Sequence, residues 1–337
     1  MLIAFKIIRQ NQSSNPSVQT YHLEADAGNT ILDCLNRIKW EQDGSLAFRK
    51  NCRNTICGSC AIRINGRSAL ACKQNVGEEI GDENNNNGDD DLPSISIAPL
   101  GNMPVIKDLV VDMKGFWKNL ETVNPYVSTS ARVVPEKEFL QTPQERSRLE
   151  ETGNCIMCGA CYSECNAVEV NSDFVGPHAL AKAYRMVEDS RDSQTQQRLQ
   201  EYNNSTSGVW GCTRCYYCNY VCPMEVEPLE QISKIKQEIL QHQSADNNRS
   251  IRHRKVLVEL VKEGGWIDER KFGLQVVGNY FRDLRGLLTL APLGLRMINS
   301  GKFPLSFKPS QGTSQVRSLI NAVQKVKEES ISNSESI

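Results

Sequence analysis

The sequence predicts an α+β fold, in which a strand-rich N-terminal segment precedes an all-helical segment and a helical C-terminal extension. Strand-like runs separated by turns continue to about residue 116, and apolar residues then recur at helical spacing. Further helical stripes occupy the rest of the chain. We therefore divide it into a first domain (1–116), a connector (117–141), a helical domain (142–243) and an extension (244–337).

The first domain alternates strand-like runs with one helix, whose apolar residues share a face within Thr30–Ile38. Asn65-Gly66 is the strongest two-residue signal for a β-hairpin. The polar run 83–91 cannot bury a core, so we interpret it as a solvated insertion. The expected strands are Leu2–Ile8, Val18–Leu23, Ala61–Ile64 and Ser94–Ile97.

Proline and glycine mark the later helices. Pro177 opens a helix over Pro177–Val187, and Pro228 is a good first helical residue for the next one. A stripe that starts at Val256 ends at Gly264-Gly265, a plausible helix stop. The apolar stretch 281–297, with its scattered arginines, fits a membrane surface or a partner subunit equally well. An amphipathic helix over 316–326 follows.

Composition limits the function classes. The net charge of -1 gives no reason to expect a nucleic acid partner. The N-terminus lacks the pattern of a signal peptide, and no apolar run reaches the ~20 residues that span a bilayer. We therefore expect a cytoplasmic or matrix-side protein. Thiols stay reduced there, so the 13 cysteines predict metal binding rather than disulfides.

Twelve of the 13 cysteines fall into three tight groups, and the first has the spacing of a plant-type [2Fe–2S] site. Three thiolates come from one short C-x4-C-x2-C loop, and a fourth follows the Asn65-Gly66 hairpin. Gly58 and Ser59 keep the loop small, so that backbone N–H groups can approach the sulfurs. A zinc site is the alternative, but zinc favours two separated C-x2-C pairs. The candidate ligands are Cys52, Cys57, Cys60 and Cys72.

The other eight cysteines form two C-x2-C-x2-C-x3-C runs, which are the signature of a two-cluster ferredoxin. In that design the fourth cysteine of each run binds the cluster of the other run. Structural zinc is again the alternative. The predicted [4Fe–4S] ligands are Cys155, Cys158, Cys161 and Cys222. Those of the third cluster are Cys165, Cys212 and Cys218, and the spacing leaves open whether Cys215 is a fourth.

These motifs resemble the iron–sulfur (B) subunit of succinate dehydrogenases and fumarate reductases over about residues 1–240. The similarity covers the cysteine loop 52–61, Lys107–Asp112, the paired runs, Arg185 and Ser190-Arg191-Asp192. It implies a β-grasp [2Fe–2S] ferredoxin domain before an α-helical ferredoxin domain. It also implies an electron-transfer role, in which electrons leave succinate at the FAD of a flavoprotein subunit and pass through three clusters towards quinone. The chain would lie peripherally at the membrane, on its cytoplasmic side, with a membrane-anchor subunit.

Two departures from the family pattern resemble its non-classical branch in archaea and cyanobacteria. Most members have an aliphatic residue where this chain has Cys215, and they hold [3Fe–4S] there. The extra thiolate predicts a third [4Fe–4S] cluster, with [3Fe–4S] as the alternative. Residues 166–170 lack the usual tryptophan, and Thr213 replaces the usual histidine, which places the usual quinone pocket in question.

The remaining features favour simpler interpretations. Cys34 lies on a helix face and is expected to be a buried small hydrophobe. The scattered histidines are expected to be structural or exposed, and the tyrosines around the second run to pack near the clusters. No G-x-G-x-x-G follows a strand, so substrate and flavin chemistry should lie in another subunit. The alternative function is a subunit of a heterodisulfide-reductase-like or glycolate-oxidising complex, because residues 264–269 and 301–305 are similar to a heterodisulfide reductase ferredoxin subunit.

Overall fold

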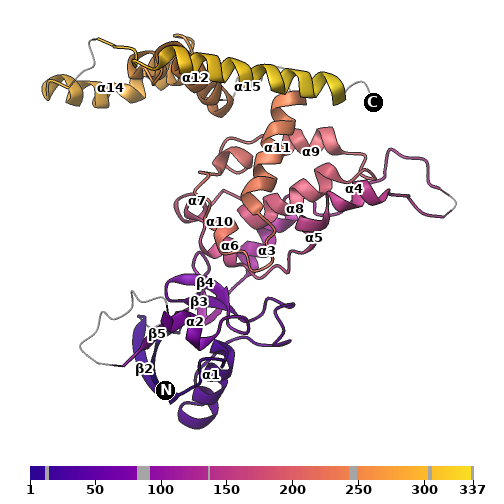
Figure 1. The fold of residues 1–337 in the computed structure, drawn as a ribbon, viewed down its shortest axis with the longest axis vertical. Coiled ribbons are helices and arrows are strands. Elements are labelled where there is room, and N and C mark those ends of the chain that lie inside the picture. The colour runs from indigo at the N-terminus through magenta and orange to yellow at the C-terminus, as the bar shows by residue number, and fades with distance from the viewer. Residues whose placement is uncertain (12–14, 82–91, 136, 243–248, 303–305, 335–337) are drawn as a thin grey trace. The chain divides into compact units, whose positions relative to one another are not determined.

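The computed structural model divides the chain into two compact units, residues 1–242 and 243–337, which are described separately below (Figure 1). It describes all residues except 12–14, 82–91, 136, 243–248, 303–305 and 335–337. The predicted insertion at 83–91 lies outside the described residues. The finer domain boundaries at 116 and 141 stay predictions.

The first unit opens with a five-stranded mixed sheet in the order β2-β1-β5-β3-β4. β1 pairs antiparallel with β2 and parallel with β5, while β3 pairs antiparallel with β4 and β5. The predicted Asn65-Gly66 turn joins β3 to β4, and both of its residues have positive φ. The strands are β1 (Leu2–Arg9), β2 (Ser17–Glu24), β3 (Ala61–Ile64), β4 (Arg67–Leu70) and β5 (Ser94–Ala98).

Helix α1 (Ile31–Arg37) packs its apolar face into the core beside the sheet. Thr30 caps it: the threonine hydroxyl accepts from the Asp33 N–H, and the Asp33 carboxylate accepts from the Thr30 N–H. A π-helical turn, η1 (Ile38–Gln42), continues the helix and was not predicted. The other elements of this part are α2 (Val76–Gly81), β6 (Val105–Lys107) and β7 (Val110–Val111).

A partly buried ion pair joins β1 to the β6–β7 turn. Arg9 Nε lies 3.0 Å from Asp108 Oδ1, and the Ala47 N–H donates to Asp108 Oδ2 at 2.9 Å. Asp108 belongs to the Lys107–Asp112 segment that carried part of the family resemblance. Its carboxylate therefore joins strand β1 to the segment around Ala47, which precedes the first cysteine loop in the chain.

The rest of the first unit is helical, as predicted, and its core is continuous with that of the sheet. Two long helices, α8 and α11, pack together, and each begins at the proline identified in the sequence. The helices are α3 (Lys114–Glu121), α4 (Pro143–Ser147), α5 (Glu150–Gly153), α6 (Ala160–Ser163), α7 (Asn166–Val170), α8 (Pro177–Glu188), α9 (Thr195–Tyr202), η3 (Val209–Gly211), α10 (Tyr217–Tyr220) and α11 (Pro228–His242).

A buried arginine holds the connector against this helical part. Arg198, on α9, pairs with Asp192 at 2.9 Å and donates to three backbone carbonyls, those of Val123, Asn124 and Tyr126. Burial opposes ionisation of Asp192, but Arg198 and the N–H groups of Ser128 and Gln194 together outweigh it, so the pKa of Asp192 is lowered. Arg198, which sequence spacing did not reveal, thus holds the connector together with Asp192 and Tyr202, whose hydroxyl donates to the Val123 carbonyl.

The second unit, residues 243–337, consists of helices around a small core of Val256, Leu260 and Val276. The predicted helix stop is present: α12 ends at Gly264, and Gly265 follows with φ +77°. Helix α15 packs on α12, and α14 packs on η4. The elements are α12 (Arg249–Gly264), α13 (Glu269–Phe272), η4 (Gly273–Val277), α14 (Leu284–Asn299) and α15 (Thr313–Ser334).

Candidate metal centres

The first cysteine group lies on and beside the loop that leads into β3. Cys52, Cys57 and Cys60 lie on this loop, and the β3–β4 hairpin returns the chain so that Cys72 joins them. The Thr55 N–H donates to Cys72 Sγ, and the Asn54 N–H to Cys52 Sγ, both at 3.3 Å. Left-handed backbone at Arg53, Thr55 and Gly58 curls the loop around the sulfurs. All four predicted positions are therefore brought together.

Thiol acidity in this group depends on how far each sulfur is buried and hydrogen-bonded. Burial alone would raise the pKa of Cys57, but the Ser59 hydroxyl and nearby backbone N–H groups lower it to about 6. Burial raises the pKa of Cys60 to about 12. Ser59, which the sequence marked only as small, thus also stabilises a thiolate.

The two C-x2-C-x2-C-x3-C runs repeat one local conformation. In both runs the residues that flank the second cysteine are left-handed: Met157 and Gly159 in the first, Arg214 and Tyr216 in the second. A four-residue helix follows each, α6 in the first run and α10 in the second. The two helices contact each other, so the runs meet face to face.

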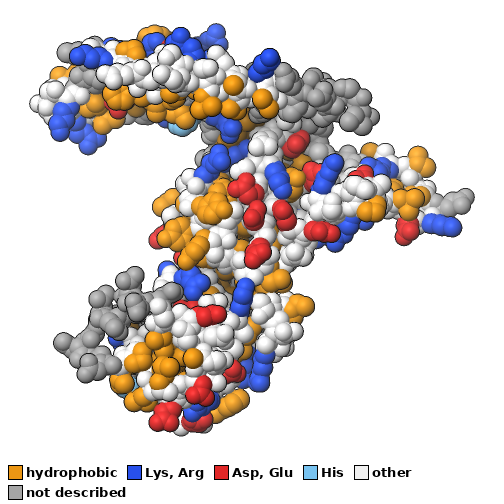
Figure 2. Space-filling view, viewed as in Figure 1, with side chains coloured by type: hydrophobic (Ala, Val, Ile, Leu, Met, Phe, Trp, Pro, Cys, Tyr) orange, Lys and Arg blue, Asp and Glu red, His pale blue; other side chains and the backbone are white. Residues whose placement is uncertain are grey.

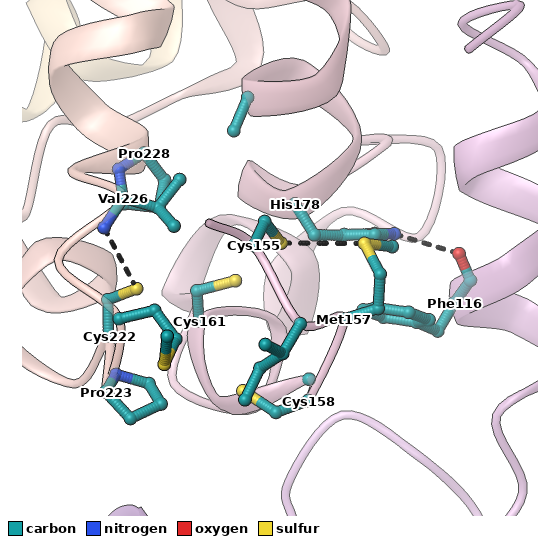
Figure 3. Close-up of a pocket in the computed structure, with 14 residues that line it drawn as sticks. Phe116, Cys155, Met157, Cys158, Cys161, His178, Cys222, Pro223, Val226 and Pro228 are labelled. Atoms are coloured by element: carbon teal, nitrogen blue, oxygen red, sulfur yellow. Dashed lines mark hydrogen bonds between the residues drawn. The ribbon is translucent and has the colours of Figure 1, made fainter. Parts of the chain in front are cut away.

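Three cysteines of the first run and the last cysteine of the second line one pocket (Figure 3). They are Cys155, Cys158, Cys161 and Cys222. The Val226 N–H donates to Cys222 Sγ at 3.4 Å. Burial, with the charges of the other three thiolates, raises the pKa of Cys161 well above its usual value. The crossing of the fourth cysteine that sequence spacing predicted is present in this geometry.

The remaining four cysteines form a third group. Burial, followed by the thiolates of Cys212, Cys165 and Cys215, raises the pKa of Cys218 to about 12. Burial likewise raises the pKa of Cys165, with further contributions from Cys212 and Cys215. Cys215 is the exposed member of the group. The Cys218 thiolate also contributes to the raised pKa of Cys161, so the second and third groups are neighbours.

Apolar and aromatic side chains enclose the pocket of the second group. The ring of His178 stacks on Phe116 with 3.9 Å between centroids, and its Nε2–H donates to the Phe116 carbonyl at 2.8 Å. Burial lowers the pKa of His178 to about 4, so the ring is neutral. Its Nδ1 is buried and has no hydrogen-bond partner among the described residues. His178 is structural, as predicted, but its place beside the cysteines was not.

The first group lies directly against the second. A Cβ atom at Gly58 would lie only 2.9 Å from Cys158 Cα, so only glycine allows this approach. Polar contacts reinforce it: Ser68 Oγ donates to Ser163 Oγ at 2.8 Å, and the Gly101 N–H donates to the same oxygen at 2.7 Å. The sheet and the helical runs are thus joined where the cysteine loops meet.

The donor sets fit iron–sulfur clusters. Each group offers four cysteine sulfurs, with backbone N–H groups directed at several of them, which is the ligand chemistry of [2Fe–2S] and [4Fe–4S] centres. In the part of the chain that the structure describes, no group of three or more His, Cys, Asp or Glu side chains is suited to a single metal ion.

Comparisons with known proteins agree with this geometry. Residues 4–118 match a 2Fe-2S iron-sulfur cluster binding domain, and residues 151–226 match a 4Fe-4S dicluster domain. The fumarate reductase iron-sulfur subunit of Escherichia coli is 36% identical over 230 residues, which are 66% of this chain and 89% of that protein. The chain belongs to the family of succinate dehydrogenase and fumarate reductase iron–sulfur subunits.

Another relative in this family is the mitochondrial succinate dehydrogenase [ubiquinone] iron-sulfur subunit 3 of Arabidopsis thaliana, 35% identical over 241 residues, 70% of this chain and 74% of that one. A chain of the Mycobacterium smegmatis Sdh1 complex shares the fold, with a TM-score of 0.63 at 22% identity, covering 73% of this chain and 98% of that chain. The predicted α+β fold, with an N-terminal [2Fe–2S] ferredoxin domain and a helical ferredoxin domain, is confirmed.

Family membership settles the class of protein. The chain is an electron-transfer iron–sulfur subunit, and it holds a [2Fe–2S] and a [4Fe–4S] cluster. A heterodisulfide-reductase-like or glycolate-oxidising complex is not favoured. The non-classical branch and the type of the third cluster stay predictions. Among the helices that the structure describes, none has the length and apolar character needed to cross a membrane.

Proposed function

We propose that the chain conducts electrons in a succinate:quinone oxidoreductase, from a flavoprotein subunit towards quinone. The observation that carries this proposal is the gathering of twelve cysteines into three neighbouring groups within one continuous core. Bound clusters supply one-electron redox chemistry. The order of the groups, with the first against the second and the second beside the third, suits transfer along a single row.

The proposed ligands follow the three groups. Cys52, Cys57, Cys60 and Cys72 hold [2Fe–2S]; Cys155, Cys158, Cys161 and Cys222 hold [4Fe–4S]; Cys165, Cys212, Cys215 and Cys218 hold the third cluster. Backbone N–H groups of residues 54, 55 and 226 donate to the sulfurs and stabilise their negative charge. The apolar walls around the second group exclude water and so influence its reduction potential.

We further propose that the third cluster is [4Fe–4S]. Cys215 shares its group with three other thiols, and the left-handed residues beside it repeat those beside Cys158 in the first run. A loop with the same conformation in both runs supports the same ligand count in both. The expected consequence is a lower reduction potential than that of a three-iron cluster.

Substrate chemistry is assigned to partners. The described cysteine groups supply conduction alone, so succinate oxidation belongs to a flavoprotein (FAD) subunit. A membrane-anchor or membrane-associated subunit would pass electrons to quinone, and the complex would lie peripherally on the cytoplasmic side of the membrane. Whether net flux runs from succinate or towards fumarate depends on those partners.

Purification of the native complex, followed by EPR, tests the proposal. Succinate should reduce the clusters only when the flavoprotein is present, and a complex whose clusters ignore succinate would contradict the assignment. The chain should carry about ten iron atoms, and Cys215→Ser should lower this to about nine while creating an oxidised [3Fe–4S] signal. Cys34→Ser is the matched control and should change neither. An oxidised [3Fe–4S] signal in the unmodified chain would refute the role of Cys215.

A further inference from the structure

The second unit carries an exposed apolar helix face. It lies outside both family matches, which end at residue 226. Helix α14 is apolar on most of its circumference, yet none of its residues is fully buried. One side packs on the unit: Leu287 lies against Gly278, and Leu290 against Gly273. The other side is open to solvent, with exposed fractions of 65% at Leu284, 70% at Leu288, 61% at Leu295 and 57% at Ile298.

Helical periodicity makes these exposed residues one stripe. Leu284, Leu288, Leu295 and Ile298 are separated by four, seven and three residues, which places them on a single face. Arg285 and Arg296 are each one position further along the chain than a stripe residue, so they form the adjoining edge. Two exposed aromatic side chains, Tyr280 and Phe281, immediately precede the helix.

The charge around the helix is predominantly positive. Residues 279–302 contain four basic side chains and one acidic side chain, Asp283, in a chain whose net charge is -1. The Asp283 carboxylate is occupied as the helix cap and accepts from the Gly286 N–H at 2.8 Å. In Figure 2 hydrophobic and basic side chains gather together on the surface of this unit at α14. The basic residues are Arg282, Arg285, Arg296 and Lys302.

We propose that α14 binds the surface of an anionic membrane, with its leucine stripe among the lipid chains and its arginines at the phosphates. At 16 residues the helix is about 24 Å long, less than the ~20 residues of a spanning helix, so it fits a position in the interface plane. Arginine stems can lie along apolar surface while their heads reach the headgroups. An uncharged protein groove would suit the leucines but would leave the basic edge unmatched, and a second copy would place like charges together.

This surface lies outside the cysteine groups, so the inference goes beyond electron transfer and does not depend on it. Vesicle flotation of the full-length, cluster-loaded protein tests it. We expect binding to vesicles with about 30% phosphatidylglycerol to exceed binding to pure phosphatidylcholine by at least tenfold, and to weaken as salt rises. Iron content and EPR, measured on the same samples, report separately on the clusters.

Two double variants and one control sharpen the test. Leu288→Gln with Leu295→Gln should lower vesicle binding about tenfold or more, and Arg285→Gln with Arg296→Gln should remove the preference for phosphatidylglycerol. These side chains are exposed, so folding should be unaffected. Leu319→Gln, on α15, removes a leucine that is 66% exposed on another helix and should leave binding unchanged.

Several results would overturn the proposal. One is a folded, cluster-loaded protein that stays with neither vesicle type. Another is equal loss of binding in the α14 leucine variant and the Leu319 control. A third is concentration-dependent dimerisation, measured by analytical ultracentrifugation without lipid, that the α14 leucine variant abolishes; this would assign the stripe to a second copy.

Discussion

Replacing Gly58 with alanine should separate the two halves of the first unit where their cysteine loops touch. The added Cβ would lie 2.9 Å from both Cys158 Cα and Cys158 Cβ and 3.0 Å from the Ile156 carbonyl oxygen. Carbon atoms in contact normally lie about 3.5–4.0 Å apart. The loops must therefore move by about 0.6–1 Å, because the atoms that the Cβ meets belong to backbone and a cysteine stem rather than to a flexible side chain.

The cost has two parts. Overpacking of this kind typically destabilises by about 1–3 kcal/mol. Gly58 has φ +69°, a conformation that costs a non-glycine residue about 1–2 kcal/mol. Together they predict a loss of about 2–5 kcal/mol, which for a unit of this size lowers the thermal midpoint by roughly 4–20 °C.

The assay is loss of the visible iron–sulfur absorbance on heating, at one scan rate for all variants. Gly66→Ala is the matched control, because Gly66 also has positive φ, at +79°, but no atom lies within 4 Å of the position that an added Cβ would take. It should lose only the conformational cost of about 1–2 kcal/mol. If Gly58→Ala unfolds at the same temperature as Gly66→Ala, the contact between the two cysteine loops does not exist as described.

Three further substitutions test individual side chains. Arg198→Ala should cost about 3–5 kcal/mol, because it leaves the buried Asp192 carboxylate without its positively charged partner and removes the hydrogen bonds of the guanidinium to the connector carbonyls; chemical denaturation measures this, and a loss below ~1 kcal/mol would contradict the buried pair. Asp108→Ala should cost about 1–3 kcal/mol, because it removes the acceptor of Arg9 Nε and of the Gln10 and Ala47 N–H groups while Arg9 keeps its ion pair with Asp43; the same assay measures this, and an unchanged midpoint would argue against the Asp108 contacts. Cys34→Ala should keep the iron and acid-labile sulfide contents unchanged, since Cys34 is 1% exposed and its pKa is raised to about 11 by burial; a fall in iron would make it a ligand.

Local features of the first unit could be predicted from short stretches of sequence. Asn65-Gly66 predicted its hairpin because few other residues accept two consecutive left-handed conformations. Pro177 and Pro228 predicted the starts of α8 and α11 because proline fits the first helical turn. The cysteine spacing predicted three groups because ligands that share a short loop can surround one centre. In each case the cause lies within a few residues.

What only the tertiary structure decided is which distant segments meet. In the sequence, Arg198 is an ordinary helix residue. In the structure, its guanidinium donates to backbone carbonyls more than 70 residues earlier in the chain. His178 carried no ligand spacing, yet it stacks on Phe116 beside the second cysteine group. Gly58 was predicted only to keep its loop small, whereas the structure shows that its missing Cβ also admits Cys158. Spacing restricts backbone conformation over a few residues, but contacts of this kind depend on how several helices and a sheet pack at once.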